Sequence, residues 1–324
     1  MTTMRAWFLS FTTIAGAAAA QAGPILVVKR ADPMFDQAFQ VIAEGLRSTH
    51  EVVAHDVVKK TSFEDFYSKV NSVKPEFMLL MDNGPVKHAL TLSEKVGDPF
   101  AGLKAVASFA LNLRKQLMGH ATIAGIAYEV PALTIMTQFR FLIGQPLKNV
   151  LAIYRKSEFE ATVQEAREQL SAENINLIAL DAESKGKGKE AVEGFLEDNL
   201  QEIVHGTRID AVWVITDNAL INQATLAGIW LKRAKTFKVP FLCGVEPFVA
   251  RSLDFCTFAA APNTVDLAEQ MVEMTQSILE DGIAPSDLGV KYLVSVVKIL
   301  DVVKAERLGF VIAPERLGDV KIVR

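Results

Sequence analysis

The chain alternates short apolar runs with amphipathic segments, and the whole alternation occurs twice. In the first half the apolar runs include ILVVK, EFMLLM and ATIAGIA, which are separated by stretches with apolar residues at helical spacing. The pattern then restarts with NVLAIY, INLIAL, AVWVI and PFLC. Strands that alternate with helices build parallel sheets covered by helices on both faces. We therefore predict an α/β fold of two doubly wound parallel-sheet lobes joined by hinge crossovers.

The length of the chain and the point of restart predict where each lobe lies. A chain of 324 residues is long enough for two lobes. The expected bounds are 23–145, completed by about 262–288, for the first lobe, and 146–261, completed by about 289–324, for the second. The crossovers between the lobes are then expected near Gln145–Lys148, near Ala259–Pro262 and near Gly289–Lys291.

The first 22 residues are typical of an export signal. Arg5 precedes the uncharged stretch AWFLSFTTIAGAAAA, and Ala20-Gln21-Ala22 has the small-x-small pattern of a cleavage site. The apolar stretch is shorter than the roughly 20 residues that a membrane span needs. No cysteine lies near the cleavage site, so a lipoprotein anchor is not expected. We predict cleavage after Ala22 and a periplasmic location.

Composition and motifs exclude several classes of function. A net charge of -4 and a pI near 5.8 do not indicate the basic face of a nucleic-acid binder. The five histidines are scattered without metal-ligand spacing, so no metal is expected. No nucleophile elbow or P-loop occurs. The segment GKGKEA from Gly186 fits the GxGxxA form of a dinucleotide-binding loop, but it follows the second strand of its lobe after a charged spacer and not the first strand directly. We therefore interpret it as a solvated loop. We therefore expect no catalytic residues, no cofactor and no enzymatic activity.

Polar residues follow several predicted strands at their carboxyl ends, where open α/β sheets bind ligands. Two Asp-Asn pairs occupy matching places after the third strand of each lobe. The alternative is helix N-capping, for which Asp and Asn are well suited, and the two roles can coexist. The predicted ligand-binding residues are Asp82, Asn83, Tyr128, Glu129, Arg155, Asp217, Asn218 and Glu246.

Several segments together resemble a known family. They are GIAYEVPALTIMTQFRFLI, NVLAIYRKSEFEATVQEAREQL, AVWVITDNALINQATLAGIWLKRAKTFKVPFLCGVEPFVA and KAERLGFVIAPERL. Following a signal peptide, they look like the extracytoplasmic substrate-binding proteins of ABC transporters, in the group that includes tryptophan-binding members. The first loop, KRADPMFDQAF, lacks the polar residues usual in that family, and the segment after Glu246 lacks its common glycines.

The resemblance implies a type I periplasmic-binding-protein fold and a role in solute import. Two lobes would close on a small solute and deliver it to an ABC permease and its ATPase. The alternative is an extracytoplasmic ligand-sensing module, which differs only in its partner. A repressor of the same fold would need a helix-turn-helix where this chain has its signal. A Rossmann-like enzyme would need a glycine loop or a nucleophile at the first strand.

The charges at the predicted cleft favour an amino acid or a related amine as the solute. Four acids, Asp82, Glu129, Asp217 and Glu246, are expected at its edge. Buried carboxylates need a cation or a donor, which the solute can supply. The protein cations that could neutralise them, or hold a solute carboxylate, are Lys29, Arg30, Arg155 and Lys156. Tyr128 or Phe248 could stack on an apolar part of the solute.

The two cysteines leave one question open. Cys243 and Cys256 lie in short apolar runs that could be neighbouring strands. In an exported protein they could form a disulfide. The alternative is a pair of buried free thiols, because cysteine is among the most buried residue types.

Overall fold

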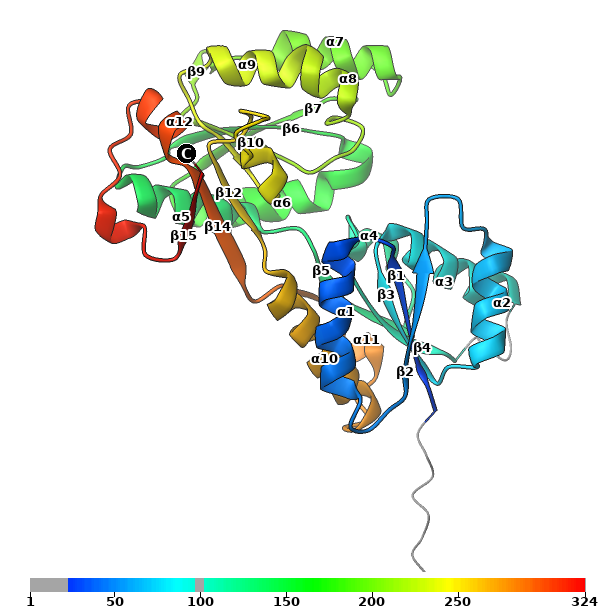
Figure 1. Ribbon diagram of the computed structural model, residues 1–324. Helices are drawn as coiled ribbons and strands as arrows, with labels where there is room; N and C mark the ends of the chain where they lie inside the picture. The colour runs from blue at the N-terminus through cyan, green and yellow to red at the C-terminus, as the bar shows by residue number, and fades with distance from the viewer. Residues whose placement is uncertain (1–22, 97–101, 324) are drawn as a thin grey trace, which may run out of the picture.

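The computed structural model of the protein describes residues 23–96 and 102–323. It contains two α/β lobes joined by extended segments (Figure 1). The predicted signal peptide, residues 1–22, lies outside the described residues. Within the described ranges, no helix combines the length and the hydropathy needed to cross a bilayer.

The first lobe is built on a six-stranded parallel sheet with the strand order β13-β5-β4-β3-β1-β2. Strands β3 and β5 are buried along their whole length, which explains their unbroken apolar sequences. The strands are β1 (Ile25–Arg30), β2 (Val52–Val57), β3 (Phe77–Met81), β4 (Lys104–Ser108), β5 (Ile123–Ala127) and β13 (Val290–Tyr292). The helices are α1 (Pro33–Leu46), α2 (Phe63–Val73), α3 (Asn83–Val96), α4 (Leu113–Gln116), α10 (Thr264–Leu279) and α11 (Pro285–Leu288).

The second lobe has a seven-stranded sheet with the order β15-β14-β12-β11-β10-β6-β7, in which only the β12–β14 pair is antiparallel within the described residues. Its strands are β6 (Asn149–Tyr154), β7 (Asn176–Asp181), β10 (Ala211–Val214), β11 (Phe241–Cys243), β12 (Phe258–Pro262), β14 (Val296–Asp301) and β15 (Val320–Val323), and β8 (Ile203–Val204) with β9 (Thr207–Arg208) forms a separate hairpin. The helical elements are α5 (Ala132–Ile143), α6 (Lys156–Ala172), α7 (Lys189–Asn199), α8 (Gln223–Thr225), a π-helical turn (Leu226–Trp230), α9 (Leu231–Thr236), a 3-10 turn (Glu246–Val249), α12 (Val302–Arg307) and a second 3-10 turn (Pro314–Arg316).

Helix α10 returns from the second lobe to complete the core of the first. It lies along α1 (Figure 1), and its buried face joins the cluster formed by β1, β3 and α1. The two helices approach closely at Gly45, where a Cβ atom would lie 2.8 Å from Cγ1 of Val272. The first lobe is therefore assembled from two stretches that are far apart in the sequence.

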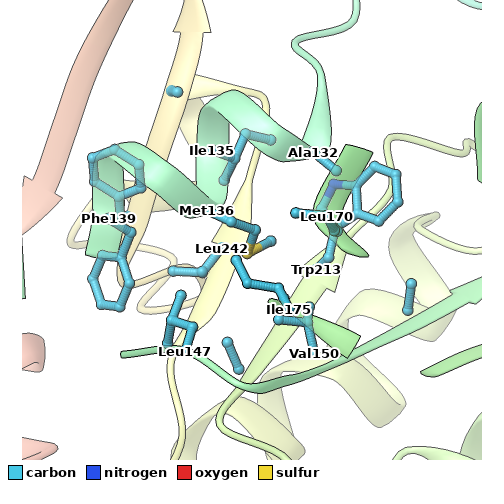
Figure 2. Close-up of a cluster of buried hydrophobic side chains, with 14 of the residues drawn as sticks. Ala132, Ile135, Met136, Phe139, Leu147, Val150, Leu170, Ile175, Trp213 and Leu242 are labelled. Carbon is cyan, nitrogen blue, oxygen red and sulfur yellow. The ribbon is translucent and has the colours of Figure 1, made fainter. Parts of the chain in front are cut away.

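Helix α5 packs in the second lobe, whereas the sequence predicts that the first lobe extends to residue 145. Figure 2 shows its side chains beside those of second-lobe elements, which include Leu147, Val150, Leu170, Trp213 and Leu242. Ile135, Met136 and Phe139 of α5 are almost completely buried in this cluster. The first crossing consequently lies at residues 128–131, ahead of the helix, and not near Gln145–Lys148.

The other two crossings lie on either side of α10 and β13. The chain leaves β12 at Pro262 and enters α10 after Asn263, whose side chain caps the helix by accepting from the backbone N–H of Val265. Residues Val290–Tyr292 pair with β5 of the first lobe. The third crossing therefore follows at residues 293–295, later than the expected position near Gly289–Lys291, because a short strand added to the edge of the first sheet carries no periodicity that the sequence could reveal.

Candidate ligand-binding site

The carboxyl ends of β1 and β3 bring Arg30 and Asp82 together at the edge of the first lobe. Nη1 of Arg30 lies 3.4 Å from Oδ2 of Asp82, and the guanidinium lies 5.2 Å from the ring centre of Phe35. Asp82 has a φ of 101°, a conformation that is strained for a residue other than glycine. Its Oδ1 accepts from the backbone N–H of Asn83 at the start of α3. Asp82 thus pairs with a charged side chain and also accepts from the first N–H of α3.

An aromatic wall adjoins this pair. The rings of Phe35 and Phe109 lie 5.5 Å apart, and those of Phe109 and Tyr128 lie 5.7 Å apart. Burial raises the pKa of the Tyr128 hydroxyl, so the group stays protonated as a hydrogen-bond donor. We call Arg30, Phe35, Asp82, Phe109 and Tyr128 the first half-site. Phe109 directly follows β4, and this strand-end position was the signal that could have identified it.

The matching edge of the second lobe carries a bidentate ion pair. Nε and Nη2 of Arg155 donate to the two carboxylate oxygens of Asp217 over 2.7 and 2.9 Å. Asp217 also accepts from the backbone N–H of Ala219 over 2.8 Å, so it shapes the turn after β10 as well. The side-chain hydrogen bond to Asp217 raises the pKa of the Arg155 guanidinium. We call Arg155 and Asp217 the second half-site.

The remaining predicted polar residues have separate surroundings. Oδ1 of Asn83 accepts from the Gln116 side chain over 2.8 Å, and Asn218 is exposed beside Asp217. Glu246 forms an ion pair with Lys321 of β15. The structure therefore gives Glu246 a partner within its own lobe.

Of the two lysines that the sequence offered as cleft cations, Lys29 has both of its charged partners within the first lobe. Nζ of Lys29 is buried between Asp36 of α1 and Asp56 of β2, at 2.5 Å from each carboxylate. Lys156 begins α6, and its backbone N–H donates to Asp181. Lys29 is thus held within the first lobe, and the two arginines are the cations of the half-sites.

A cavity of about 80 Å³ lies where the two lobes meet beside the first crossing. We call it the hinge cavity. The first lobe contributes the segments after β4 and β5 together with β13, and the second lobe contributes α5, α6 and the ends of β10 and β11. Its lining residues are Leu111–Arg114, Ala127–Ala132, Ile135, Phe159, Thr162, Glu165, Ala166, Gln169, Trp213–Thr216, Gly244, Val245 and Tyr292.

Two of the predicted site residues, Tyr128 and Glu129, line this cavity. Glu129 is the charged one. Its Oε1 accepts from the backbone N–H of Asn112. Burial raises the pKa of the Glu129 carboxyl, and the hydrogen bond from Asn112 and the charge of Arg114 oppose that shift. The cavity thus holds a carboxylate whose charge is costly unless a cation approaches it.

Polar contacts between α4 and α6 connect the lobes next to the cavity. Nη1 of Arg114 lies 3.0 Å from Oε2 of Glu165 and 2.9 Å from the hydroxyl of Tyr292. Nζ of Lys115 lies 2.7 Å from Oε2 of Glu158. Burial and a hydrogen bond with Glu165 raise the pKa of Tyr292 to about 12. These contacts hold α4, which lines the hinge cavity with Leu113 and Arg114, against α6 of the second lobe.

Among the described residues, the cysteines do not form a disulfide and the His, Cys, Asp and Glu side chains do not form a metal site. Cys243 and Cys256 are buried free thiols, which answers the question that the sequence left open. Within residues 23–96 and 102–323, no group of three or more His, Cys, Asp or Glu side chains is arranged to hold a metal ion.

Comparisons with known proteins identify the fold. No protein-family model and no curated protein sequence match the chain. A ligand-free, open structure of a substrate-binding protein with adhesive properties from Clostridium difficile is similar, with a TM-score of 0.65 and 16% identity over 94% of this chain and 99% of that chain. A conserved domain protein from Vibrio cholerae gives a TM-score of 0.60 with 14% identity, over 94% and 100% of the two chains.

A third structure is an ABC domain in complex with L-Trp from Streptococcus pneumonia. It has a TM-score of 0.58 and 15% identity, over 93% of this chain and 100% of that chain. The three structural alignments cover nearly the whole of both chains, so the likeness includes both lobes and the crossings between them. The chain has the type I periplasmic-binding-protein fold.

Proposed function

We propose that the protein is the extracytoplasmic solute-binding protein of an ABC importer. It binds a small solute between its two lobes without changing it chemically, and it delivers the solute to a membrane permease that works with an ATPase. The export signal expected over residues 1–22 agrees with this role and implies a periplasmic location. Of the similar proteins, one is a substrate-binding protein and another is an ABC domain in complex with L-Trp.

The observation that carries this proposal is the pairing of two half-sites on the carboxyl edges of two separate sheets. Arg30 and Asp82 lie on one edge, and Arg155 and Asp217 lie on the other. Ligands of open α/β sheets bind at such edges. Three crossings connect the lobes, so the half-sites can approach each other when the lobes rotate about a few hinge residues.

The half-sites favour an amino acid or a related amine as the solute. Arg155 presents a guanidinium that can share its hydrogen bonds with a solute carboxylate. Asp82 and Glu129 can accept from an ammonium group, and the wall of Phe35, Phe109 and Tyr128 suits an apolar side chain. Tryptophan is the ligand of one protein with this fold, and aromatic amino acids are accordingly the first solutes to test.

A panel of amino acids and amines tests the proposal. We expect at least one member to raise the melting temperature of the mature protein and to bind saturably in calorimetry. Arg155→Ala should weaken that binding by at least about tenfold, because it removes the guanidinium of the second half-site. Arg307→Ala is the control, since Arg307 pairs with Asp254 within the second lobe. Equal binding by the parent and the Arg155 variant would contradict the proposed site.

A further inference from the structure

The charged residues that line the hinge cavity do not balance. Arg114, Glu129 and Glu165 carry one positive and two negative charges when ionised. Arg114 is committed to Glu165 over 3.0 Å, and the second carboxylate oxygen of Glu165 accepts from Gln169 over 3.1 Å. Glu129 accepts a backbone N–H from Asn112 but has no such ion pair. A monovalent cation in the cavity would restore the balance.

The walls of the cavity set the shape of that cation. Four aromatic side chains line it: Tyr128, Phe159, Trp213 and Tyr292. Aromatic surfaces attract flat apolar groups and also cations. A water molecule needs about 10–15 Å³ on this measure, so a volume of about 80 Å³ corresponds to several water molecules. That space suits a compact aromatic amine and is too large for a bare inorganic ion.

We propose that the hinge cavity binds the ammonium group and the flat apolar body of the solute, with Glu129 as the acceptor of the ammonium. This assignment rests on the proposed function and narrows it. It selects one of the four acids that the sequence offered, because Asp217 and Glu246 have protein cations as partners and Asp82 lies beside Arg30.

The position of the cavity connects its occupant to lobe movement. Tyr128 lies in the first crossing, Tyr292 directly precedes the third, and Phe159 and Trp213 belong to the second lobe. A solute that touches both sets of residues binds with an affinity that depends on the angle between the lobes. By linkage, it shifts the protein toward the angle at which it binds best.

The test compares phenethylamine with 3-phenylpropionate, which has a similar size and the opposite charge. Calorimetric titrations use the mature parent protein, Glu129→Gln and the control Glu246→Gln. The amide keeps an acceptor for the N–H of Asn112 but removes the charge. We expect phenethylamine to bind the parent saturably, at least about tenfold more weakly to Glu129→Gln, and equally to Glu246→Gln. We expect 3-phenylpropionate to bind the parent more weakly than phenethylamine.

Three outcomes would overturn the assignment: no saturable binding of phenethylamine to the parent up to about 10 mM, unchanged binding by Glu129→Gln, or tighter binding of 3-phenylpropionate. Circular dichroism confirms that each variant is folded. If the Glu129 assignment fails while Arg155→Ala still weakens a solute from the panel, the proposed function stands without it. If no solute binds the parent, the proposed function itself fails.

Discussion

Asp82 and Asp217 occupy equivalent places after the third strand of each lobe, yet the structure gives them different surroundings. The Asp217 side chain is 2% exposed and forms a bidentate pair with Arg155, whereas Asp82 is 25% exposed and has a single longer contact with Arg30. The sequence predicted that polar residues gather at these edges. It could not rank them, because Arg155 and Asp217 are 62 positions apart and only the folded sheet brings them together.

Asp217→Asn should lower the free energy of unfolding by about 2 kcal/mol, because it leaves the Arg155 guanidinium without its charged partner. The effect stays below that of a fully buried pair, since Arg155 remains 24% exposed. Denaturant unfolding measures the change. Asp198→Asn is the matched control: its pair with Lys185 spans 3.5 Å between exposed side chains, so a loss below about 0.5 kcal/mol is expected. Equal losses in both variants would contradict a structural role for the Arg155–Asp217 pair.

At the scale of elements, the periodicity of the sequence predicts where helices and strands lie along the chain better than it predicts which sheet each helix packs on. The segment after Pro131 was expected to be a helix, and α5 forms there. Its sequence is apolar on several sides, so nothing in its period shows which sheet it covers. The packing of α5 shows that it covers the second sheet, because the ring centre of Phe139 lies 5.6 Å from the ring centres of both Phe258 and Phe310 of the second lobe.

Phe139→Ala should therefore lower the stability of the second lobe by about 3–5 kcal/mol, as the loss of a buried ring and the resulting cavity require. Phe141→Ala, two residues further along α5, removes a ring that is 61% exposed and should change stability by less than about 0.5 kcal/mol. Chemical denaturation followed by tryptophan fluorescence reports on both, since Trp213 lies in the same cluster as Phe139. A large loss in the Phe141 variant would show that α5 presents another face to the core.

At the scale of the whole molecule, the sequence indicated two lobes and three crossings, and the type I fold agrees with that plan. Residues 128–131 line the hinge cavity, residues 293–295 follow Tyr292, which also lines it, and Pro262 and Asn263 lead into α10. The sequence predicted Tyr128 and Glu129 of this cavity but missed the rest of its lining, because that lining comes from strand ends, α4, α5, α6 and β13 together. A site assembled from both lobes has no local signature in the chain.

Two lobes with separate cores should rotate as rigid bodies around these crossings. We expect a saturating solute from the panel to reduce the radius of gyration in small-angle X-ray scattering, because the half-sites approach each other as the lobes close on it. An amino acid that fails to shift the melting temperature serves as the control and should leave the curve unchanged. A scattering curve that is the same with and without a bound solute would contradict the closure mechanism.

The return of α10 to the first lobe has a consequence for how the polypeptide acquires its structure. Neither lobe is a continuous stretch: α1 packs on a helix that begins at Thr264, and β14 and β15 finish the second sheet from residue 296 onward. Contacts between residues so distant in sequence form slowly, because closing a long loop costs conformational entropy before the burial of apolar surface can offset it. A ribosome or a translocation channel that still holds the last 60 or so residues therefore also prevents both lobes from reaching their native state. The polypeptide therefore remains unfolded enough to pass through a channel until almost all of it has emerged, and the two lobes then complete their folding together.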